Sequence, residues 1–355
     1  MRQKKQMKML GLLGLLAVLP IISACVGNKG SDESQKEKMV QSVSVVQPVT
    51  GTWINLAYKD VRNKYTNPQH FDNMDPKLWT AKVRELANMG IEYLVFMEVA
   101  NEGKAYYPSK LMPWLYNDKL QSPVDAILDE AAKHGMKVFM STGWAKDQDD
   151  NLLDPVIKER QLEIMEELAS LYKNHKAFYG WYLPVEDCLC PIFAEHAVQS
   201  VNALTEKAHS LTPGKKTLIS PYGIGLSEFD HPDFEKQMAK LKVDIIAYQD
   251  EVGCVRDKFT LPRLKKNWQR MRDIHNRLNI EMWANCETFT WEEGTNDRQS
   301  ALIPAAYSRL LSQQVAASVA GVDKIISFMF GGIIEDPKSV YQLGQPVWSN
   351  NLYNN

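Results

Sequence analysis

Residues 177–187 read AFYGWYLPVED, and this stretch indicates the fold of the whole chain. It begins with apolar and aromatic residues, as a strand buried on both faces does. It ends at Glu186 and Asp187, and a carboxylate at the end of a buried strand is costly unless a site uses it or a cation pairs with it. The pattern recurs about a hundred residues later in IEMWANCETF (280–289), where Glu287 follows an apolar strand.

Strand and helix patterns alternate along most of the chain. Eight apolar segments are expected as strands, at 51–58, 91–99, 136–144, 177–185, 216–222, 243–249, 280–286 and 322–330. Apolar residues at helical spacing lie between them, at 76–89, 122–134, 157–173, 193–210, 232–241, 262–278 and 303–320. A doubly wound sheet would bring a Gly-rich phosphate loop after an early strand, and the sequence has none. We therefore predict an α/β fold, a single (β/α)8 TIM barrel that forms a catalytic domain over residues 48–355.

The first 47 residues read as a targeting segment and a linker. Four basic residues precede an apolar run at 9–22 that is short for a membrane span, and Ile22-Ser23-Ala24-Cys25 resembles the bacterial lipobox. We predict a lipoprotein signal peptide over 1–24, acylation of Cys25, and a flexible polar tether over 25–47. The alternative is an ordinary secretory signal in which Cys25 is incidental.

The charge balance bears on the partners. Cleavage before Cys25 removes four of the 41 basic residues and none of the 43 acidic ones, which leaves a formal charge of −6. This charge argues against nucleic acid as a partner, because phosphate binding needs a basic surface. We expect a monomer outside the cytoplasm, on the outer membrane, that contacts the membrane through its N-terminal lipid alone.

Polar and aromatic residues gather where the predicted strands end, which is the end of a (β/α)8 barrel that carries active sites. Carboxylates and amides suit sugar hydroxyls, and aromatic rings stack on apolar sugar faces. The candidate substrate-binding residues are Asn55, Tyr58, Glu98, Trp144, Tyr222, Gln249, Asp250 and Trp291.

Glu186 and Glu287 follow the fourth and seventh predicted strands, and this placement resembles the clan A glycoside hydrolases. The chain is also similar to poorly characterised glycosidase-like bacterial lipoproteins. The resemblance implies a retaining hydrolase of an oligo- or polysaccharide, with Glu186 as acid/base and Glu287 as nucleophile. Such a mechanism needs one protonated and one ionised carboxyl group. We expect burial near Trp181 and Tyr182 to keep Glu186 protonated and polar neighbours to keep Glu287 ionised.

Val185 departs from the clan pattern, in which an Asn before the acid/base binds the sugar 2-hydroxyl. This departure favours a second hypothesis, a non-catalytic carbohydrate-binding lipoprotein on an inactive barrel. The presence of both glutamates favours the enzyme. Two further alternatives are an inverting pair that includes Asp250 and a purely structural pairing of either Glu with a Lys or Arg.

Four cysteines, Cys188, Cys190, Cys254 and Cys286, are expected at the active-site end. Their spacing is not that of a zinc site. In an exported protein, a disulfide between Cys254 and either Cys188 or Cys190 is favoured, although spacing alone does not fix the Cα distance. No HExxH motif or nucleophile elbow appears, so we expect neither a metal nor another cofactor.

Overall fold

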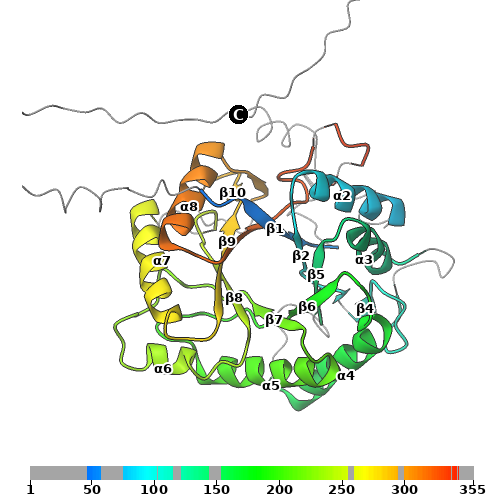
Figure 1. Cartoon of the computed structure of the whole chain (residues 1–355), viewed down its shortest axis with the longest axis horizontal. Coiled ribbons are helices and arrows are strands. Elements are labelled where there is room, and N and C mark those ends of the chain that lie inside the picture. The colour runs from blue at the N-terminus through cyan, green and yellow to red at the C-terminus, as the bar shows by residue number, and fades with distance from the viewer. Residues whose placement is uncertain are drawn as a thin grey trace, which may run out of the picture. The chain divides into compact units, whose positions relative to one another are not determined.

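The computed structural model describes residues 46–56, 75–101, 103–114, 121–143, 153–254, 260–294, 300–336, 338–341 and 343. Within these residues, eight parallel strands close a barrel and helices surround it (Figure 1). The strands, in order around the barrel, are β1 (Val49–Ile54), β2 (Tyr93–Phe96), β5 (Lys137–Ser141), β6 (Phe178–Tyr182), β7 (Lys216–Ile219), β8 (Ile245–Gln249), β9 (Glu281–Glu287) and β12 (Lys324–Phe328). The predicted (β/α)8 barrel is confirmed.

Seven helices lie within the described residues, and four of them begin at a side-chain N-cap. They are α2 (Pro76–Asn88), α3 (Pro123–Lys133), α4 (Pro155–Tyr172), α5 (Glu195–Leu211), α6 (Phe234–Met238), α7 (Leu261–His275) and α8 (Tyr307–Ala320). Asp75, Ser122, Asp154 and Thr260 each accept a hydrogen bond from a first-turn amide, and a proline follows within the first two helical positions. None of the helices in the described ranges has the length and apolar character needed to span a bilayer.

Two separate cores hold the barrel together. Inward side chains such as Trp53, Tyr182 and Trp283 fill the barrel interior, while outward ones pack against the helices. At Gly180 of β6 an added Cβ would lie 2.4 Å from the Lys216 carbonyl oxygen, so this close contact between β6 and β7 requires glycine. Burial of both strand faces explains the continuous apolar runs in the sequence.

Two boundaries differ from the prediction in ways that affect the site. β6 ends at Tyr182, so Glu186 lies in the following loop and not at the strand end. The helix expected from residue 303 begins only at Tyr307, because β11 (Leu302–Pro304) pairs with β10 (Phe289–Trp291) in a hairpin. Pro304 explains the late start, since the residue before a proline disfavours the helical conformation. A second hairpin joins β3 (Ala100–Asn101) and β4 (Lys104–Ala105).

A buried ion pair fixes the segment that follows β12. Lys82 of α2 lies 2.7 Å from Glu335, and both side chains are fully buried. Glu335 also accepts hydrogen bonds from the amides of Gly332 and Leu343. Lys82 contacts Glu85 and the Ser339 hydroxyl as well, both at 3.0 Å. The residues after β12 are thereby held against α2.

We predict that Lys82→Met destabilises the fold by about 3–5 kcal/mol, because it leaves the Glu335 carboxylate buried without its cation. The measurement is the free energy of unfolding in urea. The control is Lys236→Met, which removes an exposed pair with Asp233 and is expected to change the midpoint little. Equal effects of the two substitutions would contradict this account.

Candidate active site

Glu186 lies at the mouth of the barrel and is half-buried. Its Oε1 accepts a hydrogen bond of 3.1 Å from the side-chain amide of Gln249, at the end of β8. The same amide donates to the Ser220 carbonyl oxygen at 2.9 Å, which fixes its orientation. Glu186 is therefore both positioned by a neutral donor and accessible from the barrel mouth.

Glu287, the last residue of β9, is only 4% exposed. Its Oε2 accepts a hydrogen bond of 2.6 Å from the Cys254 amide, and the Gly253 amide also stabilises the carboxylate. A Cβ on residue 253 would lie 3.0 Å from Glu287 Oε2 and 2.4 Å from the Phe289 carbonyl oxygen. Only glycine lets this loop approach the carboxylate so closely.

Two further carboxylates surround Glu287. Asp250 is fully buried, and it accepts hydrogen bonds from the Glu287 amide at 3.1 Å and from the side-chain amide of Gln313 at 2.6 Å. Glu251 is 7% exposed and accepts a hydrogen bond of 2.7 Å from the Gly223 amide. Its φ of 52° is left-handed, a strained conformation for a residue other than glycine and one that clusters at functional sites.

The electrostatics of this cluster differ from the prediction. Burial and the neighbouring Asp250 and Glu251 raise the pKa of Glu287 to about 8. Burial likewise raises the pKa of Glu251 to about 7 and raises that of Asp250. The expectation that polar neighbours keep Glu287 ionised is wrong for the free protein, because those neighbours include two carboxylates.

A hydrogen-bonded floor lies below the two glutamates. The Trp53 indole N–H donates to Asn285 Oδ1, and Asn285 donates to the Ser220 hydroxyl, both at 3.1 Å. The Tyr182 ring packs edge-on against Trp53 with ring centroids 4.6 Å apart. The Tyr182 hydroxyl is buried and has no hydrogen-bond partner among the described residues.

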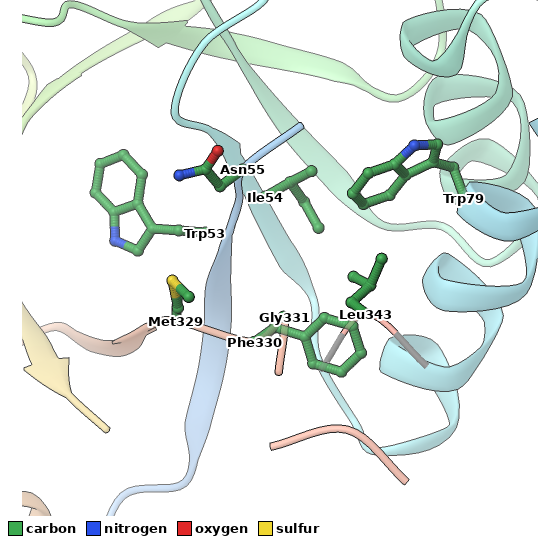
Figure 2. A pocket seen from close by; sticks show the side chains of 8 residues that line it. All are labelled: Trp53, Ile54, Asn55, Trp79, Met329, Phe330, Gly331 and Leu343. Carbon is green, nitrogen blue, oxygen red and sulfur yellow. The ribbon is translucent and has the colours of Figure 1, made fainter. Parts of the chain in front are cut away.

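The other predicted residues have varied surroundings. Glu98 is buried and accepts a hydrogen bond of 2.7 Å from the Leu56 amide, so it stabilises the backbone that follows β1. Tyr222 is 40% exposed, and the Trp291 indole N–H donates to the Cys254 carbonyl oxygen at 3.1 Å. Asn55 lines a small pocket together with Trp53, Trp79 and Leu343 (Figure 2). Tyr58, Trp144 and Cys25 lie outside the described residues.

The predicted disulfide is wrong in its pairing. Cys188 bonds to Cys190, with their Cα atoms 5.2 Å apart, and not to Cys254. The Leu189 amide between them donates to the Tyr222 carbonyl oxygen at 2.8 Å, which attaches the loop after Glu186 to the end of β7. Among the described residues, no group of three or more His, Cys, Asp or Glu is arranged to hold a metal ion.

The sequence reasoning missed two supporting residues on α8. Arg309 donates to the Glu287 carbonyl oxygen at 2.8 Å, and Gln313 donates to the same oxygen at 3.1 Å. They are spaced four residues apart, so they share one helix face. Polar residues at this spacing are typical of the solvent-exposed face of a helix, so the sequence alone does not indicate that Arg309 and Gln313 contact the Glu287 backbone.

Residues 49–341 match the family described as Domain of unknown function (DUF4434). The chain belongs to this family. A segment of 144 residues is 29% identical to the protein named Glycosyl hydrolase DigH of Escherichia coli K12, covering 37% of this chain and 32% of that protein. The match thus spans about a third of the relative's length.

Two solved structures from Bacteroides thetaiotaomicron share the fold. One is a candidate alpha-L-fucosidase, with a TM-score of 0.65 and 21% identity over 87% of this chain and 94% of that one. The other is a GH99 endo-alpha-mannosidase, with a TM-score of 0.50 and 14% identity over 80% of this chain and 86% of that one. The barrel of this DUF4434 member is therefore of the type found in glycoside hydrolases.

We predict that Asp250→Asn lowers the pKa of Glu287, because it removes the negative charge that opposes ionisation of this buried carboxyl. The measurement is a carboxyl ¹³C NMR titration of glutamate-labelled protein. Asp233→Asn, at an exposed site before the first residue of α6, is the control and should leave the titration unchanged. An unshifted Glu287 in the Asp250 variant would show that Asp250 does not set its ionisation.

Proposed function

We propose that the protein is a retaining glycoside hydrolase that acts on an oligo- or polysaccharide outside the cytoplasm. The observation that carries the proposal is the placement of Glu186 after the fourth strand and of Glu287 at the end of the seventh strand of one closed barrel. The names of the Escherichia coli relative and of the two structural neighbours support a glycosidic substrate.

Glu287 is the proposed nucleophile. The amides of Cys254 and Gly253 hold its carboxylate in one orientation, so it meets the sugar without reorganising. Its attack on the anomeric carbon forms a glycosyl-enzyme ester while the bond to the leaving oxygen breaks. Glu287 must lose its proton before it can attack, and its raised pKa makes this loss incomplete at neutral pH. The ionised fraction of Glu287 in the free protein therefore increases as the pH rises toward 8.

Glu186 is the proposed acid/base. It protonates the leaving oxygen in the first step, and as a carboxylate it removes a proton from the water that hydrolyses the ester in the second. The Gln249 amide contributes an orienting hydrogen bond and no charge. We infer that the Tyr182 hydroxyl, which is buried without a hydrogen-bond partner among the described residues, binds a sugar hydroxyl, because a buried hydroxyl left unbonded is costly.

We predict that replacing each of the two glutamates with alanine affects turnover in a different way. Glu287→Ala should abolish turnover of every substrate, because no glycosyl-enzyme can form. Glu186→Ala should spare dinitrophenyl glycosides, whose leaving group needs no proton, and added azide should accelerate the slow second step. The product is then a glycosyl azide of the substrate's own configuration, which NMR identifies.

Glu163→Ala, on the exposed face of α4, is the control and should behave as wild type. An azide product of inverted configuration from the Glu186 variant would refute the assignment. Full activity of Glu287→Ala would refute it equally.

A second candidate function is carbohydrate binding without catalysis, favoured by Val185 in place of the clan's Asn. In that case a panel of glycans would bind to wild type, Glu186→Ala and Glu287→Ala alike, and none would be cleaved. Isothermal titration beside the activity screen separates the two functions.

We further propose that Cys25 carries a lipid that anchors the protein to a membrane, because Ile22-Ser23-Ala24-Cys25 has the lipobox pattern. Growth of a bacterial host with alkyne-labelled palmitate should label the wild type and leave Cys25→Ser unlabelled and released from membranes. Equal labelling of both proteins would overturn this proposal.

A further inference from the structure

The outer side of α8 carries a row of exposed apolar side chains. Four of them are each between 38% and 48% exposed: Tyr307, Leu311, Val315 and Val319. Their spacing of four residues places them along one side of the helix, over about 18 Å, while the opposite side, which includes Gln313, is buried. Single exposed apolar residues are common on protein surfaces, whereas a continuous group of them is typical of an interaction surface.

The surroundings of this apolar row carry little negative charge. α8 has no acidic side chain, and its one charged residue, Arg309, faces the Glu287 backbone. α7 packs beside α8 (Figure 1) and contains five Lys or Arg residues and one Asp. Arg272 of α7 donates to the carbonyl oxygen of Gly321 at the end of α8. Lys265 is exposed two turns before Arg272, so it lies on the side of α7 that is turned toward α8.

The described part of the chain begins beside the same helix. The Gln47 backbone amide donates to the Ser318 hydroxyl at 2.9 Å, and the Gln47 side chain donates to the Val322 carbonyl oxygen at 2.8 Å. Val46, which precedes it, is exposed. Cys25, the proposed site of the lipid, lies about 20 residues before Val46, and a flexible chain of this length spans about 25 Å on average. A bilayer that holds this lipid is therefore within reach of the apolar row.

A bilayer fits the apolar row better than a second copy of the chain does. A stable protein interface buries roughly 800 Å² on each partner, which is more than four partly exposed side chains on one helix offer. A protein that is already tethered needs a much smaller contact, because the tether keeps its concentration at the membrane surface high. Tyr307 also suits a bilayer, since tyrosine is enriched where the acyl chains meet the headgroups.

We propose that the apolar row of α8 docks onto the surface of the lipid bilayer to which Cys25 anchors the chain, with Lys265 of α7 near anionic headgroups. α8 then lies in the plane of the membrane interface. Because the helices of such a barrel run beside its strands, the barrel mouth that holds Glu186 and Glu287 opens along the membrane surface. This docking is a second contact with the membrane, in addition to the lipid, and it does not depend on the glycosidase function.

Photoreactive lipids with a diazirine in the acyl chain test this proposal, because they label the side chains that they touch. The acylated protein is reconstituted into vesicles of phosphatidylethanolamine and phosphatidylglycerol that contain such a lipid, irradiated, and digested for peptide mass spectrometry. Adducts on the α8 peptides 299–309 and 310–324 should exceed those on the peptide with Val156 by at least about tenfold. Val156 on α4 is the reference because it is more exposed than any residue of the row.

Variants in the row show whether it makes the contact. Leu311→Glu combined with Val315→Glu should reduce the adducts on Tyr307 and Val319 by at least about tenfold, because the two charges resist transfer into lipid. Val156→Glu is the matched control and should leave these adducts at the wild-type level. Wild-type labelling should be stronger with phosphatidylglycerol than in vesicles of phosphatidylcholine alone, and Lys265→Gln should reduce that difference.

The absence of adducts on α8 in the wild type would overturn the proposal, as would equal labelling of Tyr307 and Val319 in the double variant. A dimer in solution that the double variant abolishes would assign the row to a second copy instead. Labelling that appears only after residues 344–355 are removed would assign it to that segment, and either result overturns the bilayer. If Cys25 proves unmodified, the protein is added to preformed vesicles, where adducts on α8 would still support docking and their absence would overturn it.

Discussion

The burial of Asp250 beside Glu287 is the constraint on which the rest of the site depends. Asp250 directly follows β8, and Glu287 is the last residue of the neighbouring β9. The Asp250 carboxylate accepts one hydrogen bond from the Glu287 amide and another from the Gln313 side chain. A carboxylate in this position is tolerated because amides surround it. The same arrangement ties β8, β9 and α8 together and fixes the backbone that presents Glu287.

This constraint makes the two proposed catalytic residues unequal. Glu287 is buried and accepts hydrogen bonds from backbone amides, and burial together with the neighbouring carboxylates raises its pKa. Glu186 lies in a loop beyond β6, is half-buried and accepts a hydrogen bond from the neutral side-chain amide of Gln249. A rigid, buried nucleophile and an accessible acid/base fit a retaining mechanism, because it is the acid/base that removes a proton from the attacking water.

The sequence predicted the barrel because strands buried on both faces leave a strong signal, and Glu186 and Glu287 were visible as carboxylates that interrupt apolar runs. What it did not predict depends on contacts between distant segments. The Cys188–Cys190 bond depends on a Cα distance, and the raised pKa of Glu287 depends on residues that the fold brings together. The β10–β11 hairpin was missed because its strands have only three residues each, too few for a periodic pattern.

The central claim is that Glu287 forms a covalent bond with the sugar. A 2-deoxy-2-fluoro glycoside with a dinitrophenyl leaving group slows hydrolysis of such an ester enough to trap it, so the most direct measurement is peptide mass spectrometry of the protein after reaction with these inactivators. The account predicts one added fluoroglycosyl group, on the peptide that contains Glu287 and on that residue. A label on Glu186 or Asp250, or turnover with inversion and no label, would contradict it.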